Sequence, residues 1–226
     1  MAPPPLDSSQ DTRHRLLEAA ILVFAEKGYD GAGIREIAHL AQANSALVTY
    51  HFGGKEGLYR EALRAIRDRK TSEVATLPPP PEPGAPGARD AALRGMKDYI
   101  RAFVRDLMSC PVGSEVDEAA MVFIAREIQM PHPVSAPVLV EFARPYMDRV
   151  VALLRVLCPD LDEEGRLRAT LSIQGQILHF RNSLGFIRLL TGDPEFPRDV
   201  EALIQHFTEF SLRGLGLPEA FPSARS

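Results

Sequence analysis

Three side chains in the second half of the chain have the chemistry to bind a metal ion or exchange protons. Glu127 and His132 lie in the segment REIQMPHP, and His179 follows much later. Carboxylate and imidazole groups serve as metal ligands and as general acids or bases. Pro131 separates Glu127 from His132, however, and the sequence contains no HExxH, CxxC, GxSxG, GxxxxGK(S/T) or GxGxxG motif. We therefore expect no catalytic residue, no metal site and no cofactor.

A second set of polar side chains lies near the N-terminus, in a region that reads as short helices. Apolar residues at helical spacing predict four helices, over residues 11–28, 34–41, 44–51 and 55–70. Asn44 is a good N-cap for the third helix, and Gly53 follows its end. Two short helices joined by a short turn and braced by a longer helix are typical of a helix-turn-helix. A small helical bundle without that role is the alternative.

The residues of this region also carry a family pattern. The run from Thr12 to Tyr59 contains the frame AAxxxFAEKGYxxxxIxxIAxxA, followed in order by YHFxxKExLY. It resembles the DNA-binding head of TetR-family transcriptional regulators. Two positions depart from the pattern, because Gln42 replaces a glycine in the turn and Gly33 replaces a Ser or Thr helix cap. We expect strain at Gln42 if the turn needs a positive φ, and a second helix without a side-chain cap.

In a helix-turn-helix, the second helix enters the major groove and its first turn supplies most base contacts. The base-reading candidates are Asn44, Ser45, Ala46, Leu47 and Thr49. Since none of them is Arg or Lys, we expect readout by hydrogen bonds, methyl contacts and DNA shape. The resemblance also implies phosphate contacts, for which the candidates are Arg35, Tyr50, His51 and Lys55. Packing of the third helix against the fourth is the alternative role of Tyr50 and His51.

The charge balance excludes a strongly basic DNA-coating protein, because the net charge of the chain is −4. The distribution is uneven, since residues 31–70 carry seven basic and four acidic side chains. This region can therefore meet DNA despite the overall charge. The sequence shows neither a long apolar run nor a signal peptide, and we expect a cytoplasmic protein without a membrane segment.

We predict an all-α fold, with an N-terminal three-helix head of the helix-turn-helix type and a C-terminal helical bundle. The bundle follows the Pro- and Gly-rich segment LPPPPEPGAPGAR, which should be extended. It is predicted as five helices, including single long ones over residues 163–190 and 194–215. The expected organisation is a disordered tail 1–10, a DNA-binding domain 11–58, a connecting helix 59–76, a loop 77–89, an effector-binding and dimerisation domain 90–217 and a tail 218–226.

The family resemblance adds two expectations for the bundle. The last two helices should form a homodimer, whose two heads read a pseudo-palindromic, double-stranded operator. The bundle should also enclose a pocket for a small-molecule effector, and the REIQMPHP segment is similar to the CecR group of these regulators. Candidate pocket residues are Phe103, Met121, Phe123, Arg126, Glu127, Met130, Tyr146, Gln176, His179 and Phe180. Ordinary core packing is the commoner role of such apolar side chains.

The sequence thus favours a ligand-responsive transcriptional regulator, a homodimeric repressor that a small-molecule effector releases from operator DNA. Activation in place of repression stays open. The alternative is a helical small-molecule-binding protein or enzyme whose head does not bind DNA. Operator binding that weakens steeply with salt distinguishes the two.

Overall fold

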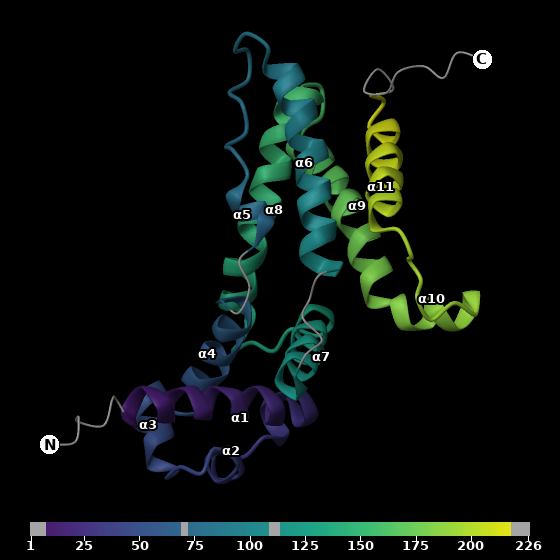
Figure 1. Ribbon diagram of the computed structural model, residues 1–226. Helices are drawn as coiled ribbons and strands as arrows, with labels where there is room; N and C mark the ends of the chain where they lie inside the picture. Colours follow the sequence, from purple (N-terminus) through teal and green to yellow (C-terminus); the bar gives the residue numbers. More distant parts are fainter. Residues whose placement is uncertain (1–7, 69–71, 109–113, 218–226) are drawn as a thin grey trace, which may run out of the picture. The chain divides into compact units, whose positions relative to one another are not determined.

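The computed structural model describes residues 8–68, 72–108 and 114–217, which fold into helices without any strand in these ranges (Figure 1). The all-α prediction is therefore confirmed. The helices are α1 (Ser8–Gly31), α2 (Ile34–Leu40), α3 (Ala46–Phe52), α4 (Lys55–Asp68), α5 (Glu73–Thr76), α6 (Ala88–Met108), α7 (Glu115–Gln129), α8 (Ala136–Leu157), α9 (Glu163–Asn182), α10 (Leu184–Thr191) and α11 (Val200–Gly214). None of them is both long and apolar enough to cross a membrane.

The helices form two compact units. The head unit contains α1 to α4, α7 and α8 as far as Ala143, and the body unit contains α5, α6, the rest of α8 and α9 to α11. This division differs from the predicted domains, which assign α7 to the effector-binding domain. The reason is the apolar face of α7, where the buried Phe123 contacts the rings of Phe24 and Tyr59. Helical periodicity identifies a buried face, but not the helix that covers it.

The head unit begins earlier than expected, since Ser8 to Gln10 belong to α1 rather than to a tail. The other residues of the two predicted tails, 1–7 and 218–226, lie outside the described ranges. The predicted break at Gly28 is present as a residue with φ 69° and ψ −174°, after which a short helical stretch continues to Gly31. The predicted connecting helix is also divided, because α4 ends at Asp68 and α5 is a separate turn.

The helix-turn-helix has the two local departures that the sequence indicates. Gln42 has φ 52°, in the left-handed region that costs a residue with a Cβ atom about 1–2 kcal/mol. Gly33 precedes α2 with an extended backbone and gives the helix no side-chain cap. Ile37 and Ala38 on α2 and Val48 and Phe52 on α3 are buried. The head therefore keeps its predicted core while its turn carries local strain.

The body unit contains more helices than expected. The predicted helix 163–190 divides at Ser183, and Figure 1 shows α10 running in a different direction from α9. The predicted helix 194–215 begins only at Val200, because the Asp199 side chain caps it by accepting a 3.0 Å hydrogen bond from the Ala202 amide. Residues 77–87 have no helical structure, as expected, and Arg149 of α8 donates a hydrogen bond to the carbonyl of Pro78.

Candidate nucleic-acid interface

One face of α3 is anchored in the head unit and the opposite face is open. Val48 and Phe52, four residues apart, are buried, whereas Thr49 is exposed and Tyr50 has 78% of its surface exposed. Among the aromatic rings of the described residues, only that of the neighbouring His51 contacts the Tyr50 ring. The two centroids are 4.9 Å apart. Tyr50 is therefore available to an external partner and does not pack α3 against α4, whereas His51 is half-buried.

The start of α3 carries the remaining base-reading candidates. Ser45 and Ala46 are exposed, while Leu47 is half-buried and packs on the head core. The Asn44 Oδ1 atom accepts a 2.8 Å hydrogen bond from the Ala46 amide. Ser45 directly precedes α3 and its side chain makes no cap bond, so Asn44, one residue earlier, supplies the oxygen that bonds to the first turn. That oxygen is therefore already engaged. A paired hydrogen bond to adenine needs both the oxygen and the amide nitrogen, so this bond must open for that readout.

Lys55 lies at the first position of α4, and two groups at the end of α1 hold its ammonium. The Nζ atom is 4.7 Å from the ring centroid of Tyr29 and 3.4 Å from the carbonyl oxygen of Asp30. Lys55 is a predicted phosphate contact, whereas Tyr29 and Asp30 are not among the residues predicted from the sequence. The available signal was the position of these residues directly after the helix break at Gly28, because such a break turns adjacent side chains and carbonyls away from the helix axis.

Arg35 lies on α2 and is exposed. The neighbouring Glu36 forms an ion pair with Lys27, and this hydrogen bond raises the pKa of Lys27. The acidic side chain beside Arg35 is therefore already partnered. Arg35, Tyr50, His51 and Lys55 remain phosphate-contact predictions, since His51 and Lys55 are both half-buried and keep part of their side chains accessible.

The ten predicted effector-contacting residues do not share one unit. Met121, Phe123, Arg126, Glu127 and Met130 belong to the head unit, and the other five belong to the body unit. Two of the head residues form hydrogen bonds with other helices of the unit. Arg126 donates a 2.9 Å hydrogen bond to the carbonyl of Phe24 just before the break in α1, and the buried Glu127 accepts a 2.6 Å bond from the Tyr59 hydroxyl. Met130 is exposed.

Glu127 and His132 lie together in the head unit, where Glu127 Oε2 accepts a 3.2 Å hydrogen bond from the backbone amide of His132. His179 belongs to the body unit and is exposed. Within the described ranges, no three His, Cys, Asp or Glu side chains lie close enough to hold a metal ion together.

The body-unit candidates other than the exposed His179 contribute to an aromatic interior. The Phe103 ring lies 5.7 Å from that of Tyr146 and stacks on Tyr99 at 5.6 Å, and Phe180 meets Phe207 edge-on at 5.7 Å. Tyr99 accepts a 2.7 Å hydrogen bond from the Gln174 side chain. Gln176 donates a bond of the same length to Ser211. These contacts make a packed core with some polar groups, which an effector would have to open.

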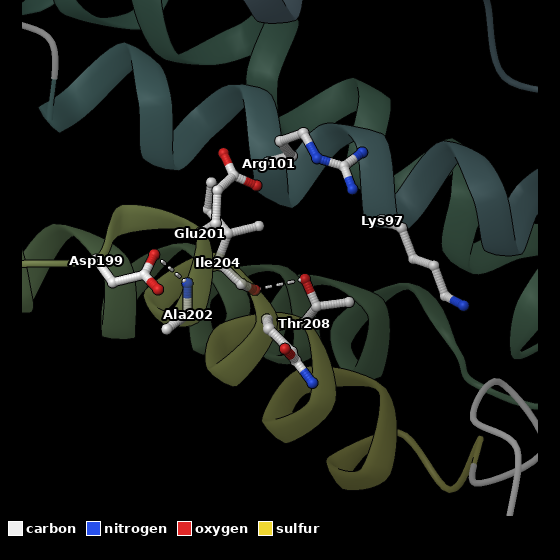
Figure 2. A pocket seen from close by; sticks show the side chains of 8 residues that line it. Lys97, Arg101, Asp199, Glu201, Ala202, Ile204 and Thr208 are labelled. Carbon is white, nitrogen blue, oxygen red and sulfur yellow. Dashed lines mark hydrogen bonds between the residues drawn. The ribbon is translucent and has the colours of Figure 1, made fainter.

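The body unit also carries an open cleft of about 420 Å³ between α6 and α11. Lys97 and Arg101 extend into it from α6, and Asp199 and Glu201 from the start of α11 (Figure 2). Its lining contains none of the predicted effector residues. Both signs of charge are present, and Glu201 is already paired with Arg105 at 2.6 Å. Most of its lining residues are charged or polar, unlike the predominantly apolar lining expected of an effector pocket.

Comparisons with known proteins match both parts of the chain. Residues 16–62 match the family model of bacterial regulatory proteins of the tetR family. Residues 96–215 match the C-terminal domain of the HTH-type transcriptional dual regulator CecR. CecR of Shigella flexneri is 28% identical over 203 residues, which cover 86% of this chain and 86% of that protein.

Other similarities are narrower or concern the fold alone. YttP of Bacillus subtilis, described as a probable HTH-type transcriptional regulator, is 43% identical over 66 residues, but the match covers only 28% of this chain and 32% of YttP. The crystal structure of NalD, the secondary repressor of the MexAB-OprM multidrug efflux pump in Pseudomonas aeruginosa, has a TM-score of 0.58 at 23% identity. That match covers 91% of this chain and 96% of NalD.

Proposed function

Because this chain belongs to the TetR family of bacterial regulatory proteins, with a C-terminal domain of the CecR type, we propose that it is a homodimeric repressor of transcription. It binds double-stranded operator DNA through α3 and leaves the DNA when a small-molecule effector binds the body. The observation that carries the proposal is the asymmetry of α3, which buries Val48 and Phe52 and presents Tyr50 to solvent. A helix anchored on one side and free on the other can enter a major groove.

The DNA contacts divide into two kinds. Exposed side chains at the start of α3 read base edges, with Asn44 and Thr49 as hydrogen-bonding groups. Arg35, Tyr50 and Lys55 hold phosphates on either side of the groove. Most of the affinity should come from the phosphate contacts. It should therefore weaken as the salt concentration rises, because binding releases counterions from the DNA and this release is less favourable at high salt.

A direct test measures binding to the DNA upstream of the gene and to sequences selected from random duplexes. Tyr50→Ala should weaken binding to every sequence about equally, because a phosphate contact carries no sequence information. Val122→Ala is a suitable control, since Val122 is 53% exposed in the same unit and lies on α7, away from α3. An intact dimer that binds neither the upstream region nor any selected duplex would overturn the proposal.

The last long helices of the body supply the dimer interface in this proposal. Leu167, Leu171 and Gly175 follow one another at intervals of four residues on α9, and all three are exposed. His206, Phe210 and Gly214 do the same on α11. At this spacing the side chains make one stripe on each helix, with exposed leucines on α9, the exposed Phe210 on α11 and a glycine on both. Exposed surfaces of this kind mark interaction sites.

Charge introduced into this stripe tests the interface. Leu171→Glu should make the protein monomeric, as measured by light scattering. It should also cause a large loss of operator affinity, because two linked heads would no longer bind the two half-sites at once. Val140→Glu is the matched control, since Leu171 is 53% and Val140 51% exposed. If Leu171→Glu remained dimeric, the α9 stripe would not be the interface.

The effector acts through a population shift. A molecule that binds better to the conformation with poorly spaced heads weakens DNA binding by its difference in affinity for the two states. Linkage then requires operator DNA to weaken effector binding by the same factor. We assign no catalytic activity to the protein, and we place it in the cytoplasm, where its DNA target lies.

A further inference from the structure

The ammonium of Lys55 is positioned before any DNA arrives. Lysine side chains are flexible, and fixing one on binding costs conformational entropy. Here the Nζ atom already lies over the Tyr29 ring at 4.7 Å, and it is 3.4 Å from the carbonyl oxygen of Asp30. An ammonium has three N–H donors, so a donor remains for a phosphate oxygen after the bond to Asp30 is made.

Tyr29 is itself held by aromatic neighbours of the head unit. Its ring lies 4.3 Å from the ring of His132, at an interplanar angle of 30°, and 5.1 Å from the ring of Tyr59, nearly edge-on. The face of Tyr29 that meets Lys55 is therefore oriented by two further side chains. One of them, His132, comes from the turn that joins α7 to α8.

His132 is fixed both at its backbone and at its ring. Its backbone amide donates a 3.2 Å hydrogen bond to Glu127 Oε2, and its Nδ1 accepts a 3.2 Å bond from the Val134 amide. Glu127 is in turn held by the Tyr59 hydroxyl. A continuous series of contacts thus runs from the buried end of α7 to the Lys55 ammonium.

We propose that Tyr29 and His132 are positioning residues for operator binding, which hold the Lys55 ammonium ready for a DNA phosphate. This inference rests on the proposed function and names the side chains that prepare one of its phosphate contacts. The gain is preorganisation, because a cation held over an aromatic face loses less freedom when the phosphate arrives.

If Tyr29 and His132 only packed the head, their replacement would affect folding without depending on the lysine. The experiment is therefore a double-mutant cycle on the full-length protein, with operator affinity measured at fixed salt. Tyr29→Leu should weaken binding about two- to five-fold for each head that touches DNA, as expected for loss of an exposed cation–π contact. Tyr29→Phe should bind as the wild type does, because it keeps the ring face.

The decisive comparison uses Lys55→Ala, which should lower the salt dependence of binding by about one counterion per head. In this background Tyr29→Leu should cause no further loss of affinity. An equal loss with and without Lys55 would show that Tyr29 acts by packing alone and would overturn the inference. Unchanged binding of Tyr29→Leu alone would also overturn it.

His132→Asn provides a second route if Tyr29→Leu fails to fold. The Asn Oδ1 atom can replace Nδ1 as acceptor for the Val134 amide, so that the turn is kept while the stacked ring is removed. It should weaken operator binding only when Lys55 is present. If the wild-type protein bound operator but Lys55→Ala had no effect, this inference would fail and the proposed function would stand.

Discussion

The Tyr59 hydroxyl donates a 2.6 Å hydrogen bond to Glu127 Oε1, joining α4 to α7 inside the head unit. Tyr59 is fully buried and Glu127 is 2% exposed, so water cannot replace either partner. Burial, and then the bond to Glu127, raise the pKa of Tyr59. The pair gives Glu127 a structural role in place of the metal or effector role that its residue type suggests.

Tyr59→Phe should lower the free energy of unfolding by about 1–3 kcal/mol, because it leaves a buried carboxylate oxygen without its donor. Urea unfolding followed by circular dichroism measures the loss. Tyr29→Phe is a control in the same unit, since it removes a hydroxyl from a half-buried ring without deleting a bond of this kind. If Tyr59→Phe were as stable as the wild type, the hydrogen bond would make no net contribution to the free energy of unfolding.

Tyrosine ionisation should make the fold sensitive to alkali. Burial raises the pKa of Tyr29, Tyr59, Tyr99 and Tyr146 above the usual value. A group whose pKa is raised in the folded state contributes stability below its unfolded pKa of about 10 and loses it as the pH rises further. The urea concentration at the unfolding midpoint should therefore decrease as the pH is raised from about 9 to about 11.

Tyrosinate absorbance, followed against pH in the native protein and in denaturant, tests whether tyrosine ionisation causes this loss of stability. Four of the five tyrosines should ionise later in the native protein than in the unfolded chain. Coincident titration curves would contradict the prediction.

The sequence predicts the helices of the head well because their signals are local. The spacing of Val48 and Phe52 indicates the buried face of α3, and the type of residue at position 42 indicates strain in the turn. The partner of α7 has no such signal. A stripe that contains Phe123 fits a body helix as well as a head helix, and only the folded chain shows that it covers Phe24 and Tyr59.

The effector candidates were predicted from residue type and helical spacing, and the structure divides them between two units. The residue types of Arg126 and Glu127 fit a polar pocket, but the carbonyl and hydroxyl that bond to them come from α1 and α4, more than sixty residues away in sequence. The break at Ser183 has only a weak local signal, because Asn182 and Ser183 favour helix ends whereas Leu184 is a strong helix former.

Gln42→Gly should stabilise the head by about 1 kcal/mol, because glycine adopts a positive φ without a Cβ penalty. Gln42 is exposed and has φ 52°, so the substitution removes strain while deleting no buried contact. Thermal unfolding should show a higher midpoint. Gln42→Ala is the control, since it shortens the side chain and keeps the Cβ atom, and it should give little gain. A comparable gain for both variants would place the effect in the side chain rather than in the backbone.

Asn44 has two functions that a pair of substitutions can separate. Its Oδ1 atom caps α3 through the Ala46 amide, and its amide nitrogen is the donor available to a base. Asn44→Ala should cost about 1 kcal/mol of stability through loss of the cap, and it should also relax base preference. Asn44→Ser keeps an oxygen for the cap but has no amide, so it should retain stability and still lose discrimination.

Thermal unfolding and affinities for operators with single base changes measure these two effects separately. The expected loss of discrimination is about 1–3 kcal/mol at the contacted base pair, with other positions unchanged. If Asn44→Ser kept the full base preference of the wild type, Asn44 would serve only as a helix cap. The sequence would then be read by the other exposed candidates, among which Ser45 and Thr49 carry hydroxyl groups.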